Sequence, residues 1–328
     1  MFRKNKEEIK SIIYATDLHG ATIVFKKFIS AAIQYKTNLA ILGGDVSGKL
    51  LFPILKNNDD TYTFNYYGQK INVKNNSELQ EYTNKIEFEG NYYKIMDRDE
   101  YERIINDKNY MFNTFKDLIV QRLKSWIDYA ESKLSPYNIP ILISGGNDDE
   151  KYVIDTITSG SSVKNVDNKI YSEFTPFIIL NVGYSNRTPF NTPREMEENE
   201  LESFLDSMLS KYGNDREHLI LNVHVPPYGT SLDLAPKVMR KEDGELSIEL
   251  KGGQPEMVHV GSIAVRRIIE KYQPALGLFG HIHENRVAEK IGNTLCINPG
   301  SSYNEGTLNF VIIRIRDNKI LSHQLLIG

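Results

Sequence analysis

Five short segments of this 328-residue chain combine Asp, Asn, His and Gly in a pattern that suits metal binding. They are Asp17-Leu18-His19-Gly20, Gly43-Gly44-Asp45, Gly145-Gly146-Asn147-Asp148, His224 and Gly280-His281-Ile282-His283. Asp17 and His19 are two residues apart, as are His281 and His283, so in extended backbone each pair of side chains points the same way. Glycines beside these residues let the backbone pass close to an ion or a phosphate.

Imidazole nitrogens, carboxylates and one amide oxygen together favour Mn, Fe, Ni, Co or Zn over Mg and Ca, which prefer oxygen ligands. Each segment taken alone has a simpler explanation, because Asp caps helices and Gly-Gly-Asp or Asn-Asp forms turns. The joint pattern is more specific, since four of the seven histidines lie in these segments, each behind an apolar run. The set therefore predicts a site for two divalent ions.

The elements that must position these segments are those of an α/β protein, with short apolar runs alternating with stretches of helical periodicity. The strands expected before the five segments cover residues 11–16, 39–42, 139–144, 219–223 and 275–279. Further strands are expected at 177–182, 294–298, 308–316 and 320–327, and helices at 21–35, 197–212 and 262–272. Ligands bind at the carboxyl ends of strands in such sheets, so the five loops are expected to meet at one edge.

Residues 51–136 interrupt this alternation, and we interpret them as an insertion after the second core strand of a single domain over 1–328. Its first half, 61–96, is rich in Tyr, Asn and Lys and predicts one or two hairpins. An apolar face in its second half predicts a long helix that includes Phe115, Ile119, Leu123, Trp126, Ile127, Ala130 and Leu134. The insertion follows Asp45 closely, so it is placed either to overhang the site and select substrates or to act as a dimerisation arm.

Composition and charge limit the classes of partner and compartment. A formal net charge of −4 with no basic stripe makes nucleic acid an unexpected partner. No apolar run approaches the roughly 18 to 20 residues that span a membrane, and the charged start has no signal-peptide pattern. The only cysteine, Cys296, forms no internal disulfide and sits in an apolar run, which predicts an inert core residue and a cytoplasmic location. The sequence makes no prediction of oligomeric state.

The ordered motifs resemble those of the calcineurin-like metallophosphoesterase superfamily, and especially its small prokaryotic members of the cyclic-nucleotide phosphodiesterase type. The matching segments are Asp17-x-His19, Gly44-Asp45, Gly146-Asn147, His224 and Gly280-His281-x-His283, and Asn298-Pro299-Gly300-Ser301 adds to the likeness. They span nearly the whole chain. The resemblance implies a four-layer αββα sandwich with the site at the sheet edges.

The resemblance also implies a role for each matching residue. One metal ion is assigned Asp17, His19 and His283, the other is assigned Asn147, His224 and His281, and Asp45 bridges them. The implied reaction is hydrolysis of a phosphodiester, or less expectedly a phosphomonoester, by a metal-bridging hydroxide without a covalent phosphoenzyme. The substrate is expected to be a small molecule, with cyclic nucleotides among the candidates, and Mn is the ion expected to support activity in vitro.

Formal charges agree with that chemistry. Two divalent ions bring four positive charges, and Asp17, Asp45 and a hydroxide remove three. The net positive charge that remains favours an anionic phosphoryl group, and favours its transition state more.

The candidate catalytic residues are Asn147, Asp148 and His224, and one of them departs from the family pattern. Most members have His directly after the Asn, where it can protonate the leaving group, whereas this chain has Asp148. A carboxylate beside two cations has a lowered pKa and is a poor general acid. Either Asp148 orients His224 or His281, or another group such as His259 supplies the proton, or the leaving group needs little help.

Two further segments are candidate substrate contacts. Tyr228 lies in a proline-rich run just after His224, and Arg187 follows the strand predicted at 177–182. Their simpler explanations are a rigid proline turn and a solvated loop charge. A nuclease of the same superfamily and a non-catalytic scaffold remain alternative functions. A scaffold is expected to have lost ligands, and all seven are present here.

Overall fold

Two six-stranded sheets form the body of the protein, which a computed structural model describes over residues 9–212, 215–241, 244–316 and 319–328. The first sheet has the order β24-β23-β1-β2-β7-β8. Its strands are β1 (Lys10–Ala15), β2 (Leu39–Leu42), β7 (Ile141–Ile143), β8 (Val163–Asn165), β23 (Asn309–Arg316) and β24 (Lys319–Ile327). The first four are parallel neighbours, whereas β23 pairs antiparallel with β1 and β24.

The second sheet has the order β21-β22-β20-β13-β10-β9. Its strands are β9 (Lys169–Tyr171), β10 (Ile178–Val182), β13 (Leu219–Val223), β20 (Leu276–Leu278), β21 (Val287–Ile291) and β22 (Thr294–Asn298). The four central strands run parallel, and β9 and β21 are antiparallel edges. Central strands such as β13 are buried along their whole length, as expected for parallel strands covered on both faces.

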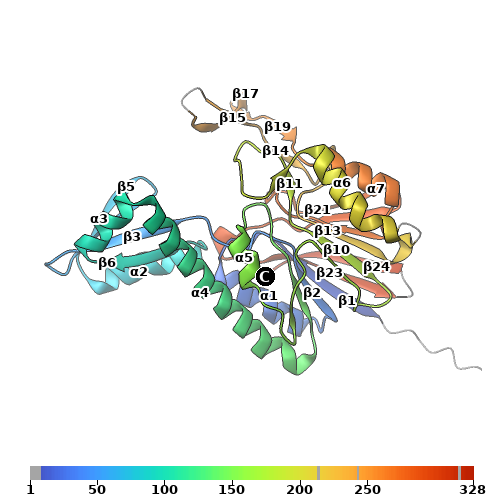
Figure 1. The fold of residues 1–328 in the computed structure, drawn as a ribbon, viewed down its shortest axis with the longest axis horizontal. Coiled ribbons are helices and arrows are strands. Elements are labelled where there is room, and N and C mark those ends of the chain that lie inside the picture. Colours follow the sequence, from blue (N-terminus) through green and yellow to red (C-terminus); the bar gives the residue numbers. More distant parts are fainter. Residues whose placement is uncertain (1–8, 213–214, 242–243, 317–318) are drawn as a thin grey trace, which may run out of the picture.

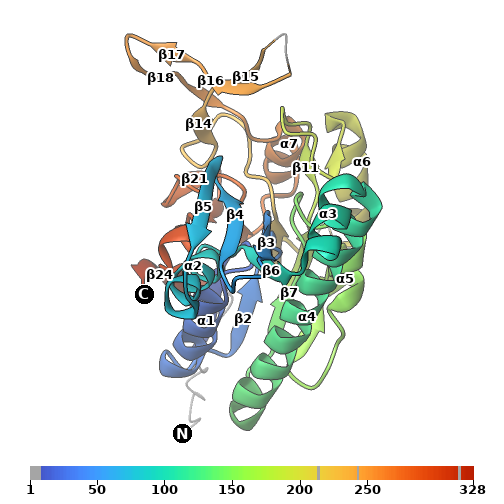
Figure 2. The ribbon, with the colours of Figure 1, turned by 90° about the vertical axis from the view of Figure 1, so that its left-hand side faces the viewer.

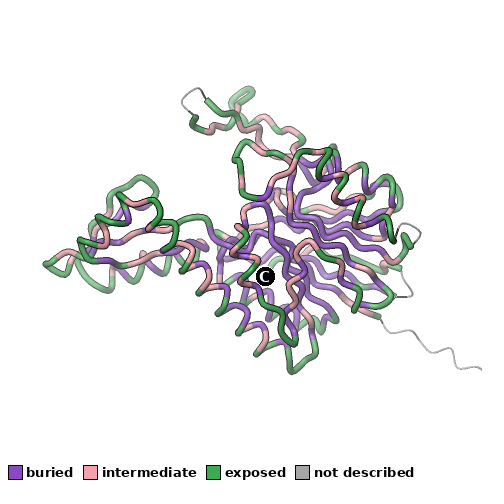
Figure 3. Tube along the Cα trace, in the orientation of Figure 1, coloured by how far each residue is buried: buried purple, intermediate pink, exposed green. Residues whose placement is uncertain are grey.

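Three hydrophobic cores lie between the successive layers of helices and sheets. One joins the first sheet to α1 (Thr22–Gln34), α4 (Lys108–Leu134) and α5 (Lys151–Thr156). Another lies between the two sheets, and the third joins the second sheet to α6 (Glu198–Leu209) and α7 (Ile263–Tyr272). The layers therefore run helices, sheet, sheet, helices (Figure 1), and Figure 3 shows the buried chain concentrated in them. The predicted mixed α/β fold is confirmed.

The insertion forms a small α+β unit that projects from this body (Figure 1). Its sheet has the order β5-β4-β3-β6, and β3 pairs parallel with β6. Its elements are β3 (Leu51–Lys56), β4 (Tyr62–Tyr66), β5 (Gln69–Val73), α2 (Asn76–Phe88), β6 (Tyr92–Met96) and α3 (Arg98–Asn106). Residues of β3, β4, β5 and α2 pack a separate hydrophobic core.

The predicted hairpin exists as β4 and β5, but the sequence prediction missed β3 and the helices α2 and α3. The sequence pattern did not predict α2 because the mean hydropathy of this helix is low and its apolar face is narrow, with Leu79 and Ile86 buried. Its start is marked by Asn75, whose side chain accepts a hydrogen bond from the Glu78 backbone N–H. The long helix is α4, and its apolar face packs onto the first sheet, so it belongs to the body and not to the projecting unit.

A second projection, between residues 234 and 259, was not expected from the sequence. Successive antiparallel pairs build it, and Figure 2 shows it standing above the body. Its strands are β14 (Leu234–Pro236), β15 (Val238–Arg240), β16 (Leu246–Ile248), β17 (Leu250–Lys251), β18 (Gln254–Pro255) and β19 (Met257–His259). The remaining short elements are β11 (Ser185–Asn186), β12 (Glu195–Met196), η1 (Ser135–Tyr137), η2 (Ser210–Tyr212), η3 (Arg216–His218) and η4 (Tyr303–Glu305).

Two general expectations can be compared with this fold. Cys296 is fully buried in the core beneath α6 and α7, and burial raises the pKa of its thiol to about 12. It is therefore a packed thiol and not a thiolate at neutral pH. Among the described residues, no helix combines the length and the apolar character needed to cross a bilayer.

Candidate metal centre

The seven predicted ligands lie in loops at the carboxyl ends of five strands. The loops after β1, β2 and β7 carry Asp17, His19, Asp45 and Asn147, and those after β13 and β20 carry His224, His281 and His283. The loops meet because the two sheets pack face to face. Backbone hydrogen bonds also join them in pairs, from Gly280 N–H to His224 C=O and from Asp17 N–H to Gly44 C=O.

One group of donor atoms consists of Asp17, His19 and His283, whose ligand atoms lie within 4.8 Å of one another. His283 Nε2 is 3.3 Å from Asp17 Oδ1 and 3.2 Å from His19 Nε2. A carboxylate oxygen and two imidazole nitrogens that face one another at this spacing suit a transition-metal ion. The resemblance assigns this same trio to one ion.

Asp45 stands between the two halves of the site. Its Oδ2 is 3.5 Å from His19 Nε2 and 3.4 Å from His224 Nε2. Asp17, Asp45 and His224 form a second group of mutually close donor atoms. A carboxylate within reach of histidines from both sheets has the position that a bridging ligand requires.

The two remaining predicted ligands are Asn147 and His281, of which His281 lies beside His224. Asn147 Oδ1 is 2.8 Å from His281 Nδ1, and the rings of His281 and His224 are 5.4 Å apart. His224 Nε2 is buried, has no hydrogen-bond partner among the described residues, and lies 3.7 Å from Asp17 Oδ1. A buried ring nitrogen without a partner costs free energy, and a divalent ion beside these carboxylates would satisfy it. The residues present therefore fit a dinuclear metal site.

The charges of the protein itself favour a cation in this position. Burial lowers the pKa of His224, but the carboxylates of Asp45 and Asp17 outweigh burial and raise it to about 9. Burial opposes ionisation of Asp17 and Asp45, yet His224 holds the pKa of both carboxyls below the usual value. Burial lowers the pKa of His281 to about 4, which keeps its lone pair available. Two ionised carboxylates thus attract positive charge while at least one imidazole stays neutral.

Close backbone approach explains two of the glycines. A Cβ on Gly146 would collide with the carboxylate of Asp45, and a Cβ on Gly280 would collide with that of Asp17. Any side chain at these positions would displace a ligand. These glycines therefore have a steric role in the centre itself.

Asp149 is a supporting residue that the sequence analysis did not single out. Its buried carboxylate accepts hydrogen bonds from the backbone N–H groups of Val46, Ser47 and Gly146, at 3.0, 3.0 and 2.9 Å. It thereby ties the loop that carries Asp45 to the loop that carries Asn147. Its position directly after the Asn-Asp pair was the only available signal.

Asp148 lies at the edge of the centre and is partly exposed. Its backbone N–H donates to Asp45 Oδ1 at 3.0 Å, and its Oδ2 forms a 2.6 Å ion pair with Lys49 Nζ. The sequence analysis expected metal ions to lower its pKa, but the groups of the protein act the other way. Burial and the charge of Asp45 raise the pKa to about 6 against the opposing effect of Lys49. The carboxylate is still mostly ionised at neutral pH.

The expected role of Asp148 in orienting histidines has no contact to support it, since among the described residues its carboxylate accepts no hydrogen bond from His224 or His281. The nearest imidazole nitrogen is Nδ1 of His19, at 4.0 Å. Sequence analysis also missed Tyr303, whose ring centroid is 4.7 Å from that of His19 and 5.8 Å from that of His283.

The structure brings two of the three candidate substrate residues together. His259 Nδ1 is 2.8 Å from the buried carboxylate of Asp233, and the ring centroids of His259 and Tyr228 are 5.7 Å apart. Arg187 instead forms an exposed ion pair with Glu197 at 2.9 Å. Among the described contacts none joins these candidates to the seven ligands, so their role in binding substrate stays a prediction.

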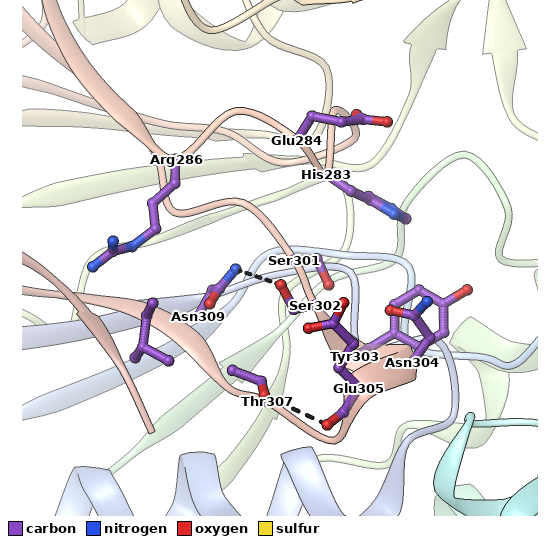
Figure 4. A pocket seen from close by; sticks show the side chains of 11 residues that line it. His283, Glu284, Arg286, Ser301, Ser302, Tyr303, Asn304, Glu305, Thr307 and Asn309 are labelled. Carbon is purple, nitrogen blue, oxygen red and sulfur yellow. Dashed lines mark hydrogen bonds between the residues drawn. The ribbon is translucent and has the colours of Figure 1, made fainter.

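A pocket of about 710 Å³ borders the centre. His283 and Tyr303 lie toward one end and Arg286 toward the other (Figure 4). The other lining residues are Glu284, Ser301, Ser302, Asn304, Glu305, Thr307, Asn309 and Ile327. Most of these side chains are polar, so the pocket suits a hydrophilic group.

Comparison with known proteins places the chain in a family. No family model matches it. The protein MJ1162 of Methanocaldococcus jannaschii, described as uncharacterized, is 32% identical over 183 residues, which are 55% of this chain and 69% of that protein. The chain belongs to the MJ1162 family. That name states no activity, so a function for this chain has to be proposed from its site.

Solved structures extend the likeness to the whole fold of this MJ1162 family member. Two of them cover 98% of the chain and 99% of their own length, with TM-scores of 0.57 and 0.53 and identities of 14% and 12%. The second is the protein TT1561 of Thermus thermophilus. A dimetal phosphatase from Danio rerio aligns more weakly, with a TM-score of 0.48. The first two structures thus share the fold of this chain over its whole length.

Proposed function

We propose that this protein is a metal-dependent phosphoesterase that hydrolyses a small-molecule phosphodiester. The observation that supports it is the convergence of the seven side chains, in which His224 Nε2 is buried without a partner among the described residues, beside two ionised carboxylates. Such a cage suits cations, because two buried carboxylates repel each other unless positive charge separates them.

The proposed ligand sets follow the two halves of the site. One ion is assigned Asp17, His19 and His283, the other Asn147, His224 and His281, and Asp45 is shared. When bound, two divalent ions activate water and stabilise negative charge on the phosphoryl group. Manganese is the ion we propose for activity in vitro.

The side chains of the protein prepare this site before any ion binds. His224 Nδ1 is 3.3 Å from the carbonyl oxygen of Gly43, which favours the tautomer that has its proton on Nδ1. That tautomer directs the Nε2 lone pair between Asp17 and Asp45. Once the Nε2 proton is lost, the second sheet would present a nitrogen donor to carboxylates from the first.

A proton donor for the leaving group is proposed at His259. Asp233 accepts three backbone hydrogen bonds, from Gly229, Thr230 and Gly261, in addition to its contact with the ring. It therefore fixes the orientation of His259 and leaves Nε2 available. Tyr228 and Arg187 are proposed as further substrate contacts, and the projecting unit that follows β2 as a wall of the substrate site.

Metal analysis and one assay test the proposal. The protein is expected to bind two equivalents of Mn²⁺ and to hydrolyse bis(p-nitrophenyl) phosphate. Asp45→Asn removes the shared carboxylate charge, so metal content is expected to fall and kcat/KM to drop by about 100-fold or more. The matched control is His323→Ala, which alters an exposed histidine on β24.

Two outcomes contradict the phosphoesterase. A wild-type protein that binds no metal, or an Asp45→Asn variant with unchanged metal content and activity, overturns it. Metal binding without hydrolysis of any phosphoester indicates the scaffold instead. Cleavage of linear DNA in place of small diesters indicates the nuclease.

A further inference from the structure

Lys49 occupies an unusual position for a surface lysine. It follows Asp45 by four residues in the loop between β2 and β3, and its ammonium lies 2.6 Å from Asp148 Oδ2. The lysine side chain is 45% exposed, whereas that of Asp148 is only 19% exposed. The pair therefore stands where the metal centre meets solvent.

Asp148 links this ion pair directly to two of the predicted ligands, Asp45 and His19. The Asp148 backbone donates to Asp45, and the Asp148 carboxylate is 4.0 Å from Nδ1 of His19. Tyr303 packs beside His19 on the same side, and its pKa is raised by burial against the opposing charge of Lys49. Asp148 and Tyr303 thus both lie beside His19, and Lys49 reaches this side of the centre through its ion pair with Asp148.

The loop that carries Lys49 is held rigidly. Asp149 accepts from the backbone of Val46 and Ser47, and Gly48 packs so tightly against the Gly90 carbonyl that a Cβ would collide with it. Partly exposed ion pairs contribute only about 0 to 1 kcal/mol to stability. The loop is fixed, yet the ion pair that it holds beside the metal centre adds little stability. We therefore infer that Lys49 serves ligand binding and not folding.

We propose that Lys49 binds the phosphoryl oxygens of the substrate and that Asp148 positions it and selects against dianionic phosphomonoesters. This proposal rests on the proposed function and adds a substrate class to it. An ammonium has three N–H donors, of which Asp148 occupies one, so donors remain for an incoming oxyanion. The Asp148 carboxylate repels a second negative charge, so a monoanionic diester fits the pair better than a dianionic monoester.

Substitutions of both residues test this role, with Mn²⁺-loaded protein throughout. Lys49→Met is expected to raise KM for bis(p-nitrophenyl) phosphate and to weaken binding of inorganic phosphate, measured by calorimetry, each by about tenfold or more. Lys49→Arg keeps the charge and is expected to recover most of both. Asp148→Asn is expected to raise kcat/KM for p-nitrophenyl phosphate relative to the diester by about fivefold or more. The control is Lys70→Met, on an exposed face of β5.

Metal content and circular dichroism of every variant separate this role from a structural one. Phosphate affinity and KM within twofold of wild type in Lys49→Met overturn the substrate contact. Loss of bound metal in that variant also overturns it, because it assigns Lys49 to the integrity of the centre. An unchanged monoester-to-diester ratio in Asp148→Asn overturns the selection. A wild-type protein without metal or activity would refute the proposed function itself.

Discussion

Four predicted ligands adopt backbone conformations that residues with side chains rarely occupy. The φ angles of Asp17, His19, Asp45 and His281 are 55°, 40°, 48° and 67°. Such conformations cost on the order of 1 to 3 kcal/mol each and persist only where the surroundings enforce them. Loops that must turn sharply at the end of a strand and still aim a side chain inward provide that enforcement. Strain of this kind at one end of both sheets agrees with a binding centre there.

At the same scale, replacement of Asp148 by His tests whether a general acid at this position adds to the proton donor proposed at His259. An imidazole at this position can protonate an alkoxide leaving group, which an ionised carboxylate does poorly. In Asp148→His, kcat for an alkyl phosphodiester relative to kcat for bis(p-nitrophenyl) phosphate is expected to rise roughly tenfold or more. The ratio of the two kcat values is the measurement, because the p-nitrophenolate leaving group needs little protonation.

The reference variant is Asp148→Asn, which removes the carboxylate without adding an acid. Its kcat ratio is expected to equal that of the wild type. A large loss of kcat on both substrates in Asp148→His would show that the carboxylate itself is needed for turnover.

Among the elements, α4 follows the projecting unit in the chain and packs onto the body. Near its C-terminal end, Glu131 binds the segment that leads into β8. Glu131 accepts hydrogen bonds from Ser161 Oγ and from the backbone N–H groups of Ser162 and Val163, where β8 begins. Burial raises the pKa of Glu131, but these hydrogen bonds outweigh burial and lower it below 4.5. The ionised carboxylate therefore stabilises the contact between α4 and the first sheet.

The pH dependence of this contact follows from the direction of the shift. A pKa lower in the folded than in the unfolded protein gives stability that is present above the unfolded value of 4.5 and is lost as pH falls through the folded value. Because Glu131 is only half-buried, Glu131→Gln is expected to cost about 1 kcal/mol at neutral pH. Urea unfolding of both proteins, at neutral pH and in steps below 4.5, measures the difference. A cost that persists undiminished at the lowest pH would contradict the assignment.

Across the whole molecule, the candidate centre is shared by the two sheets. The first sheet supplies Asp17, His19, Asp45 and Asn147, and the second supplies His224, His281 and His283. Ions held by residues of both sheets would cross-link the two sheets at the carboxyl ends of their parallel strands. Metal binding is therefore expected to stabilise the entire fold and not one loop.

Removal of metal by a chelator tests this coupling. For one site, free metal at about 100 times its Kd adds about 2.7 kcal/mol to the free energy of unfolding, since the ion binds the folded state. Chelated protein is expected to unfold at a lower urea concentration, with the difference restored by Mn²⁺. The His323→Ala control is expected to show the same stabilisation, and Asp45→Asn much less. Equal stability with and without metal would contradict a cross-linking centre.

The sequence alone determined the α/β class, the strands before each motif and which residues gather at the candidate centre. Burial imposes apolar runs on central strands, and metal chemistry restricts residue types, so both leave local patterns that are legible without a structure. The weakly apolar helix α2 left no such pattern. Only the tertiary structure decided that Lys49 meets Asp148, that Asp149 ties two loops, and that Tyr303 packs beside His19. These contacts join residues far apart in the chain, and no local spacing encodes which loops will meet.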